Sequence, residues 1–134
     1  MKSNLYRFTK SVPALAVATR TNGTVNGLTV DRWQGGAAAV DYRQSVLFTI
    51  HTGTITDGSV AITVQDSDDN AAWAAAAAGD FGGATTILST NDDTVLECYY
   101  TGSKRYARLS VVTTGATTGG SFGATAVMAG NPVR

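Results

Sequence analysis

The chain has 134 residues, with 10 basic and 10 acidic side chains, one cysteine and one histidine. That length suits a single domain. Zero net charge excludes the basic surface that holds a nucleic-acid backbone, and one Cys with one His excludes a structural zinc site and an intrachain disulfide. No apolar run approaches the roughly 20 residues that cross a bilayer. We therefore expect no nucleic-acid partner, no membrane partner and no cofactor.

Small residues dominate the composition. The chain contains 20 Ala, 20 Thr, 15 Gly and 9 Ser, whereas Glu occurs once and Lys and Gln three times each. Glu, Lys and Gln favour helices because they lose little rotamer freedom there, while Thr and Val favour strands. The composition therefore predicts an all-β domain with glycine-rich turns.

Residues 1–21 are predicted to form an extended N-terminal arm. Three basic residues, Lys2, Arg7 and Lys10, precede a short apolar run at 12–18. This pattern superficially resembles a secretory signal. The run is only seven residues long and Pro13 interrupts it, so a cleaved signal is the less favoured alternative. Because a chain end is ordered only where contacts hold it, we expect the arm to pack on its own domain or on a neighbouring subunit.

The remainder, residues 22–134, is predicted to be one domain built from short strands. Turn-forming residues separate these segments, and no helical crossover segments lie between them. The pattern indicates a single antiparallel β-sandwich or open β-barrel of about six to eight strands. Strands are expected near residues 23–31, 46–52, 60–65, 94–100, 105–112 and 121–128.

The clearest strand signal is the alternation of Val46, Phe48 and Ile50, which places three large apolar side chains on one face. A turn at 56–59 separates this segment from a second alternating one at 60–65. We expect the two segments to pair as a β-hairpin with one buried face.

An alanine-rich stretch at 71–78 departs from this pattern. Alanine is the best helix former, but two turns of helix are too short to be stable alone. We expect irregular or strand-like structure here, with a short helical turn as the alternative.

Three acidic residues before this stretch form a weak candidate metal site. Asp66, Asp68 and Asn70 alternate like the first ligands of an EF-hand loop, but the glycine and glutamate that complete such a loop are alanines here. A looser calcium site made of Asp66, Asp68 and Asp69 remains. The favoured interpretation is that these side chains cap the backbone of a turn.

Catalytic chemistry has little support in the sequence. His51 is the one imidazole, so any general-base scheme depends on it, and no Gly-x-Ser-x-Gly motif accompanies it. Cys98 lies in a predicted strand without a basic neighbour that would activate it, and is expected to be a small buried hydrophobe. We expect the protein not to be an enzyme.

The one concentrated basic patch is interleaved with tyrosines. Tyrosine and arginine are enriched at protein interfaces because they combine large contact area with hydrogen bonds. Stacking on single-stranded nucleic acid is the alternative, and the low charge makes it weak. The predicted interface residues are Trp73, Tyr99, Tyr100, Lys104, Arg105, Tyr106 and Arg108.

The same stretch carries a resemblance to a known group of proteins. An acidic turn at 65–69 precedes Trp73, and the segment Tyr100-Thr101-Gly102-Ser103-Lys104-Arg105-Tyr106-Ala107-Arg108 follows. Together with Gly130-Asn131-Pro132, this order resembles small virion proteins of tailed bacteriophages and prophages, over roughly residues 45–132. Where that group has a turn glycine, this chain has Asn70, which can adopt the same left-handed conformation.

The resemblance implies a structural role in a virus particle. It implies a capsid decoration (cement) protein that binds the outside of the shell formed by the major capsid protein, after synthesis in the bacterial host cytoplasm. Assembly as a homo-oligomer, a trimer or a dimer, is expected from the symmetry of such particles.

Two other functions stay open at this point. One is a tail or neck component of the virion. The other is a carbohydrate-binding β-sandwich in which Trp33, Trp73 and the tyrosines serve as sugar platforms, which requires several aromatic rings exposed on one face.

Overall fold

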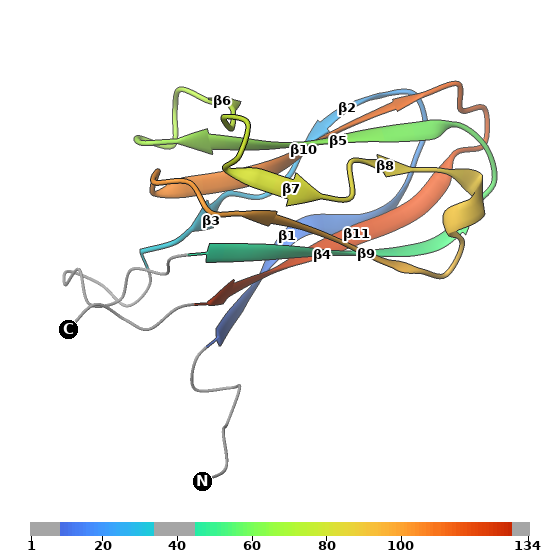
Figure 1. The fold of residues 1–134 in the computed structure, drawn as a ribbon. Helices are drawn as coiled ribbons and strands as arrows, with labels where there is room; N and C mark the ends of the chain where they lie inside the picture. Colours follow the sequence, from blue (N-terminus) through green and yellow to red (C-terminus); the bar gives the residue numbers. More distant parts are fainter. Residues whose placement is uncertain (1–8, 34–44, 130–134) are drawn as a thin grey trace, which may run out of the picture.

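The computed structural model describes residues 9–33 and 45–129, which form two antiparallel β-sheets packed face to face (Figure 1). The all-β prediction is confirmed, and the arrangement is a β-sandwich. Within those two ranges, none of the helical structure is long and apolar enough to span a membrane.

The two sheets are named sheet A and sheet B. The strands of sheet A, in spatial order, are β1 (Thr9–Arg20), β11 (Gly120–Ala129), β4 (Ser45–Ile55), β9 (Val95–Tyr100) and β7 (Phe81–Gly83). The main path of sheet B is β2 (Gly23–Asn26), β10 (Tyr106–Thr114), β5 (Ser59–Ser67) and β6 (Ala74–Ala75). Two short strands extend sheet B, since β3 (Val30–Asp31) pairs with β10 and β8 (Thr86–Ile87) pairs with β5; a 3₁₀ turn at Ser89–Asn91 follows.

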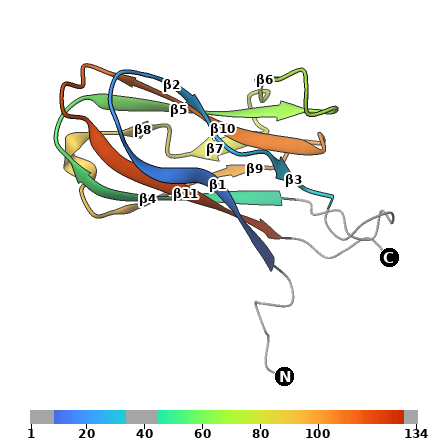
Figure 2. The same ribbon diagram turned by 180° about the vertical axis from the view of Figure 1, so that it is seen from behind.

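The core lies between the sheets and follows the predicted alternation. Val46, Phe48 and Ile50 of β4 are at most 1% exposed, so the period-two pattern identified the buried face of this strand. From sheet B, Leu109 and Val111 of β10 are equally buried. Figure 2 shows the two layers from behind, with β2 and β10 over β1 and β11. Burial of the inner faces leaves two outer faces available for contacts.

The expected hairpin between residues 46–52 and 60–65 is wrong. These residues belong to β4 and β5, which follow one another in the chain but lie in different sheets, β4 between β11 and β9, and β5 between β10 and β6. The Thr56 N–H donates to the Gly119 carbonyl at 2.9 Å, which ties this connection to the β10–β11 loop. The chain therefore crosses from sheet A to sheet B at this turn.

Asp57 holds the same crossing in place. Its carboxylate accepts hydrogen bonds from the backbone N–H groups of Thr117, Thr118 and Gly119, at 2.6–3.2 Å. These bonds favour the ionised form and lower the pKa of Asp57, and the bond from Gly119 has the largest effect. One aspartate thus joins two inter-sheet loops at one end of the sandwich.

The described part of the expected N-terminal arm, residues 9–20, is strand β1. It pairs with β11 from Thr9 opposite Ala129 to Arg20 opposite Gly120. A bulge places two residues, Ala16 and Val17, opposite Gly123. A Cβ atom at Gly123 would lie 2.9 Å from the Val17 Cα, so glycine allows this close approach. Residues 1–8 of the arm lie outside the described residues.

The alanine-rich stretch 71–78 is irregular apart from the two-residue strand β6. This confirms the expectation of irregular or strand-like structure. Asn70, just before it, has φ 59°, so the left-handed turn conformation survives without glycine. The turn carries Trp73 back over the end of sheet B.

Candidate functional site: two protein-interaction surfaces

The predicted interface residues do not form one patch. Tyr99 is 45% exposed on the outer face of sheet A, whereas its neighbour Tyr100 is fully buried between the sheets. Lys104, Arg105, Tyr106 and Arg108 lie at the end of β10 and on the outer face of sheet B. Successive side chains of a strand point to opposite faces, so adjacent tyrosines of β9 cannot share a surface.

Tyr100 is a core residue and contributes to no interface of the folded chain. Its hydroxyl donates to Asp66 Oδ2 at 2.9 Å and accepts from the Lys104 backbone N–H at 3.2 Å. Burial raises the pKa of Tyr100, and the hydrogen bond to Asp66 adds to the rise. The pair joins β9 to β5 and fixes the turn that leads into β10.

The three aspartates of the candidate calcium site are held by different partners. Asp66 accepts from Tyr100, and Asp68 Oδ2 lies 3.2 Å from Lys104 Nζ. Asp69 accepts from the backbone N–H groups of the next two alanines, 71 and 72, and these bonds lower its pKa. Among the residues described, no three His, Cys, Asp or Glu side chains are grouped to hold a metal ion. The aspartates act as caps and pairing partners.

Arg105 lies at the centre of a set of directed contacts. Its guanidinium donates twice to the Asp31 carboxylate, at 2.9 and 2.8 Å, and lies 4.8 Å from the ring centroids of both Trp33 and Tyr106. Burial alone would raise the pKa of Asp31. The hydrogen bonds from Arg105 and from the Trp33 N–H outweigh that effect and lower the pKa. The arginine is thereby fixed in one orientation.

Arg108 of β10, three residues after Arg105, has a similar arrangement. Its Nε donates to Gln65 Oε1 at 2.8 Å across the β5–β10 pair, and its guanidinium carbon lies 4.3 Å from the centroid of the Trp73 ring. Planar guanidinium groups stack well on aromatic faces. We call the resulting surface the arginine–aromatic cluster, and it consists of Trp33, Trp73, Arg105, Tyr106 and Arg108, all of them half-buried.

The sequence did not indicate the supports of this cluster. Asp31 is separated from Arg105 by 74 positions, so no local motif pairs them. Arg32 is fully buried; its Nε donates to the Lys104 carbonyl at 2.8 Å and its guanidinium lies 5.1 Å from the Tyr100 ring centroid. A buried arginine has no sequence signature, because arginine is normally a surface residue.

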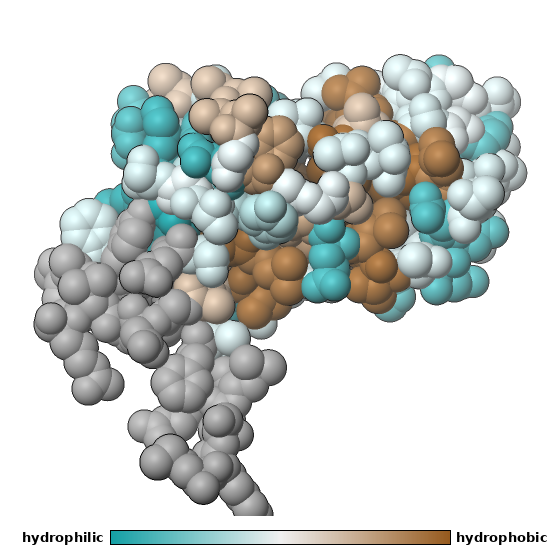
Figure 3. Space-filling model, viewed as in Figure 1, coloured by the Kyte–Doolittle hydropathy of each residue, from teal (hydrophilic) through white to brown (hydrophobic). Residues whose placement is uncertain are grey.

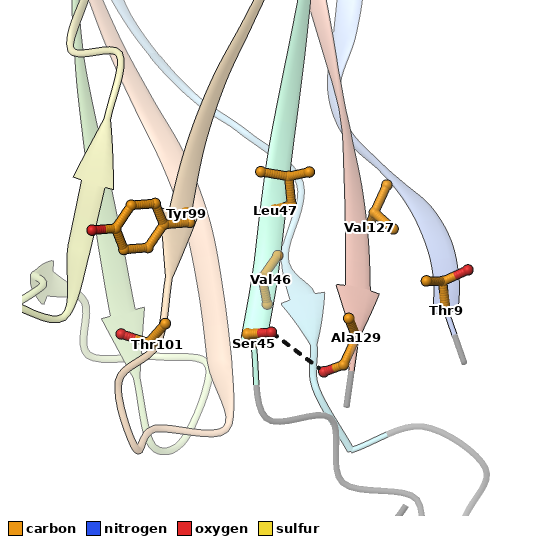
Figure 4. A pocket seen from close by; sticks show the side chains of 8 residues that line it. All are labelled: Thr9, Ser45, Val46, Leu47, Tyr99, Thr101, Val127 and Ala129. Carbon is orange, nitrogen blue, oxygen red and sulfur yellow. Dashed lines mark hydrogen bonds between the residues drawn. The ribbon is translucent and has the colours of Figure 1, made fainter. Parts of the chain in front are cut away.

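A second surface lies on the outer face of sheet A. Leu47 of β4 is paired with Tyr99 of β9 on one side and with Val127 of β11 on the other, and all three side chains project outward. They line an apolar groove of about 440 Å³, shown in Figure 4. We call it the sheet A groove, and its lining residues are Thr9, Ser45, Val46, Leu47, Tyr99, Thr101, Val127 and Ala129. Figure 3 shows hydrophobic residues gathered over β4 and β9.

The residues considered for catalysis are not joined into a catalytic set. His51, Asp93 and Ser121 line a hollow of about 270 Å³ at the other end of the same face. None of the hydrogen bonds found among the described residues connects these three side chains. Cys98 is buried, and desolvation raises its pKa to about 12, which keeps the thiol protonated and unreactive.

The fold and these surfaces define a class, namely a small antiparallel β-sandwich protein with two candidate surfaces for other proteins. Two solved structures share the fold. The SPBc2 prophage-derived protein YomS matches with a TM-score of 0.56 at 12% identity, over 91% of this chain and 93% of that one. The PBSX exported protein XepA matches with a TM-score of 0.57 at 20% identity, over 100% of this chain but 40% of that one.

These structural neighbours are prophage-derived, and at such identities the likeness establishes the shared fold. The chain spans well under half the length of XepA. No known family model matches the sequence, and no curated protein matches it either.

Proposed function

We propose that this protein is a non-enzymatic capsid decoration protein of a tailed phage or prophage. It binds the outside of the shell formed by the major capsid protein and stabilises the particle. The fold shared with two prophage-derived proteins supports a phage origin. The order of motifs between the acidic turn and Arg108, which resembles that of small virion proteins, supports the structural role.

The arginine–aromatic cluster is the observation that carries the proposal. Trp, Tyr and Arg are the residues that most often dominate the binding energy of protein interfaces. Here Asp31 and Gln65 orient the two arginines before any partner arrives. A surface held in its binding geometry loses less conformational entropy on association. We therefore assign the contact with the shell to this cluster.

Stabilisation of the shell follows from repetition. Burial of apolar surface contributes roughly 25 cal/mol per Å². The net binding free energy is what remains after the entropy lost on association is subtracted. A modest surplus at each contact, repeated over a shell, raises the free energy needed to separate capsid subunits. The low charge of the chain, 15% of residues, suits close packing against other proteins.

Electron imaging of particles made with and without the protein tests this role. We expect a density on the outer shell that disappears when the protein is absent, and particles that release their contents at a lower temperature. Unchanged shell density in its absence would contradict the proposal.

Adding purified protein back to the bare particles tests the assigned surface. Wild type should restore the density, and Arg108→Ala should bind at least about tenfold more weakly, since a hot-spot residue is worth more than about 1.4 kcal/mol. Lys10→Ala is the matched control, because it removes an exposed cation from β1, which belongs to the other sheet. Equal binding by Arg108→Ala and wild type would place the contact elsewhere.

Imaging of the same particles distinguishes two alternative functions from capsid decoration. Density at the neck or tail would indicate a component of those structures. XepA is described as an exported protein, which favours an exported, phage-associated role as the second candidate. Recovery of the protein in the culture medium without particles would favour that role.

Carbohydrate binding is less well supported. An arginine lies over the ring of Trp33 and another over the ring of Trp73, so one face of each ring is occupied, and Tyr99 lies on the opposite sheet. A glycan array with the purified protein would detect sugar binding.

A further inference from the structure

The sheet A groove lies where the undescribed segments of the chain begin. Three of its lining residues, Thr9, Ser45 and Ala129, are the described residues next to segments 1–8, 34–44 and 130–134, respectively. The rest of its apolar lining comes from strands β4, β9 and β11. The groove is therefore within reach of a chain segment that enters or leaves the sheet at this end.

The sequences of the segments differ in what they offer an apolar groove. Residues 1–8 carry four large apolar side chains, Met1, Leu5, Tyr6 and Phe8. Segment 34–44 is joined to the sandwich at both ends; five of its residues are Gly or Ala, and its large apolar side chains are Val40 and Tyr42. Segment 130–134 has one large apolar side chain, Val133. Residues 1–8 are the best match in chemistry.

The direction of β1 decides which copy of the groove these residues reach. Thr9 pairs with Ala129 at the end of β11, so a chain that kept the extended conformation of β1 before Thr9 would pass the end of its own sheet. To return to its own groove it would have to reverse direction, and Gly, Pro, Asn, Asp and Ser are the residues that turns favour. None of these occurs from Leu5 to Lys10. The sequence therefore favours a straight continuation of β1, which would carry Tyr6 and Phe8 towards a second molecule.

We propose that residues 1–8 of one copy dock in the sheet A groove of a second copy, with Tyr6 and Phe8 as the anchors. In an extended segment these two side chains share one side and Arg7 occupies the other. None of the described residues that line the groove is charged, so the aromatic side would face it and Arg7 would face water. The proposal goes beyond attachment to a shell and does not depend on it.

The contact has a defined symmetry consequence. A segment on one molecule and a groove on the next form a heterologous pair, which closes either as a reciprocal exchange of two arms or as a ring. The arginine–aromatic cluster lies on the other sheet and stays free in such an assembly. One molecule can then bind its copies and a shell at the same time.

Cross-linking in purified protein, without particles, tests the docking. Phe8→Cys is mixed with Leu47→Cys and treated with a short bis-maleimide; Cys98 is buried and does not compete. We expect a covalent pair that joins one chain of each variant. Phe8→Cys mixed with Leu28→Cys is the control, because Leu28 is 49% exposed but lies outside the groove, and this pair should not form.

Light scattering provides the second measurement. Tyr6→Ser/Phe8→Ser should reduce the wild-type oligomer to a monomer, whereas Lys2→Ser/Asn4→Ser, changed in the same segment outside the anchors, should leave its mass unchanged. A monomeric wild type would overturn the proposal. So would a cross-link found only within single chains of the double variant Phe8→Cys/Leu47→Cys, or cross-linking of Tyr42→Cys to Leu47→Cys in place of Phe8→Cys. If the docking proposal fails these tests, the binding of the arginine–aromatic cluster to particles can still be tested separately.

Discussion

The outer faces of the two sheets differ in how their side chains are held. On sheet A, Leu47, Tyr99 and Val127 present apolar area with no directed polar partner among them. On sheet B, Arg105 and Arg108 are each fixed by a hydrogen-bond acceptor and an aromatic ring. Apolar area contributes affinity with little direction, whereas oriented hydrogen bonds and stacked rings also select a partner. The groove is thus suited to an extended segment, and the cluster to one particular surface.

The largest expected loss of stability concerns Tyr100, which lies in the core and not on either outer face. Tyr100→Phe removes the hydroxyl that bonds to the buried Asp66 carboxylate and to the half-buried Lys104 N–H, and leaves both groups without this partner. We expect a loss of about 2–3 kcal/mol in the free energy of unfolding, as for hydrogen bonds to charged groups. Tyr99→Phe is the matched control and should change the stability by less than about 0.5 kcal/mol. Urea unfolding measures both, and equal losses would contradict the assignment of the two tyrosines to different faces.

The next effect concerns sheet A alone. In Gly123→Ala the new Cβ would meet the backbone of Val17 at 2.9–3.0 Å, so β1 must shift. Overpacking of this kind should cost about 1–2 kcal/mol of unfolding free energy. Gly53→Ala, on the same face, has only ordinary contacts at 3.6 Å or more and serves as the control. A stable Gly123→Ala variant would mean that the bulge in β1 is not closely packed.

As the pH is lowered, the contacts made by Asp31 on the sheet B side should be lost before the apolar contacts of the sheet A groove are affected. The pKa of Asp31 is lowered in the folded chain, so the stability it contributes is present above its unfolded pKa of about 3.9 and is lost as the pH falls through the lower folded value. Asp31→Asn should remove this dependence. Thermal unfolding of both proteins between pH 2 and 7 checks the prediction, and their difference should shrink below about pH 4. A difference in stability that stays constant with pH would show that Asp31 does not cause the pH dependence.

The smallest effect is expected at the rim of the cluster. The Lys104–Asp68 ion pair is solvent-exposed, with 43% and 77% of the two side chains accessible. Lys104→Ala should change the unfolding free energy by no more than about 1 kcal/mol. High salt should reduce even that difference. A larger loss, measured by urea unfolding, would indicate that this pair belongs to the supported part of the cluster.

The fold class could be predicted because alternation in single strands is a local property. Val46, Phe48 and Ile50 showed their buried face directly in the sequence. The connection after β4 could not be predicted, since a turn that returns to the same sheet and one that crosses to the facing sheet use similar residues. Only contacts with the distant loop 117–119 distinguish the two.

The candidate interface was predicted in part. The residue types of Arg105, Tyr106 and Arg108 indicated an interface, and this remains a prediction. Their neighbour Tyr100 was misassigned, although strict alternation along β9 already implied that it and Tyr99 face opposite ways. The pairing of Arg105 with Asp31 and the burial of Arg32 depend on contacts between positions more than 70 residues apart, which one sequence does not reveal.

The pairing of β1 with β11 has a consequence for how the molecule is made. The first and last described strands are hydrogen-bonded neighbours, so sheet A lacks an inner strand until β11 has been synthesised. Folding dominated by such distant pairings takes milliseconds to seconds. The sandwich is therefore completed after translation of its last strand. A chain cut short before residue 120 would leave β1 without its partner strand and one edge of β4 unpaired, and both would be prone to aggregation.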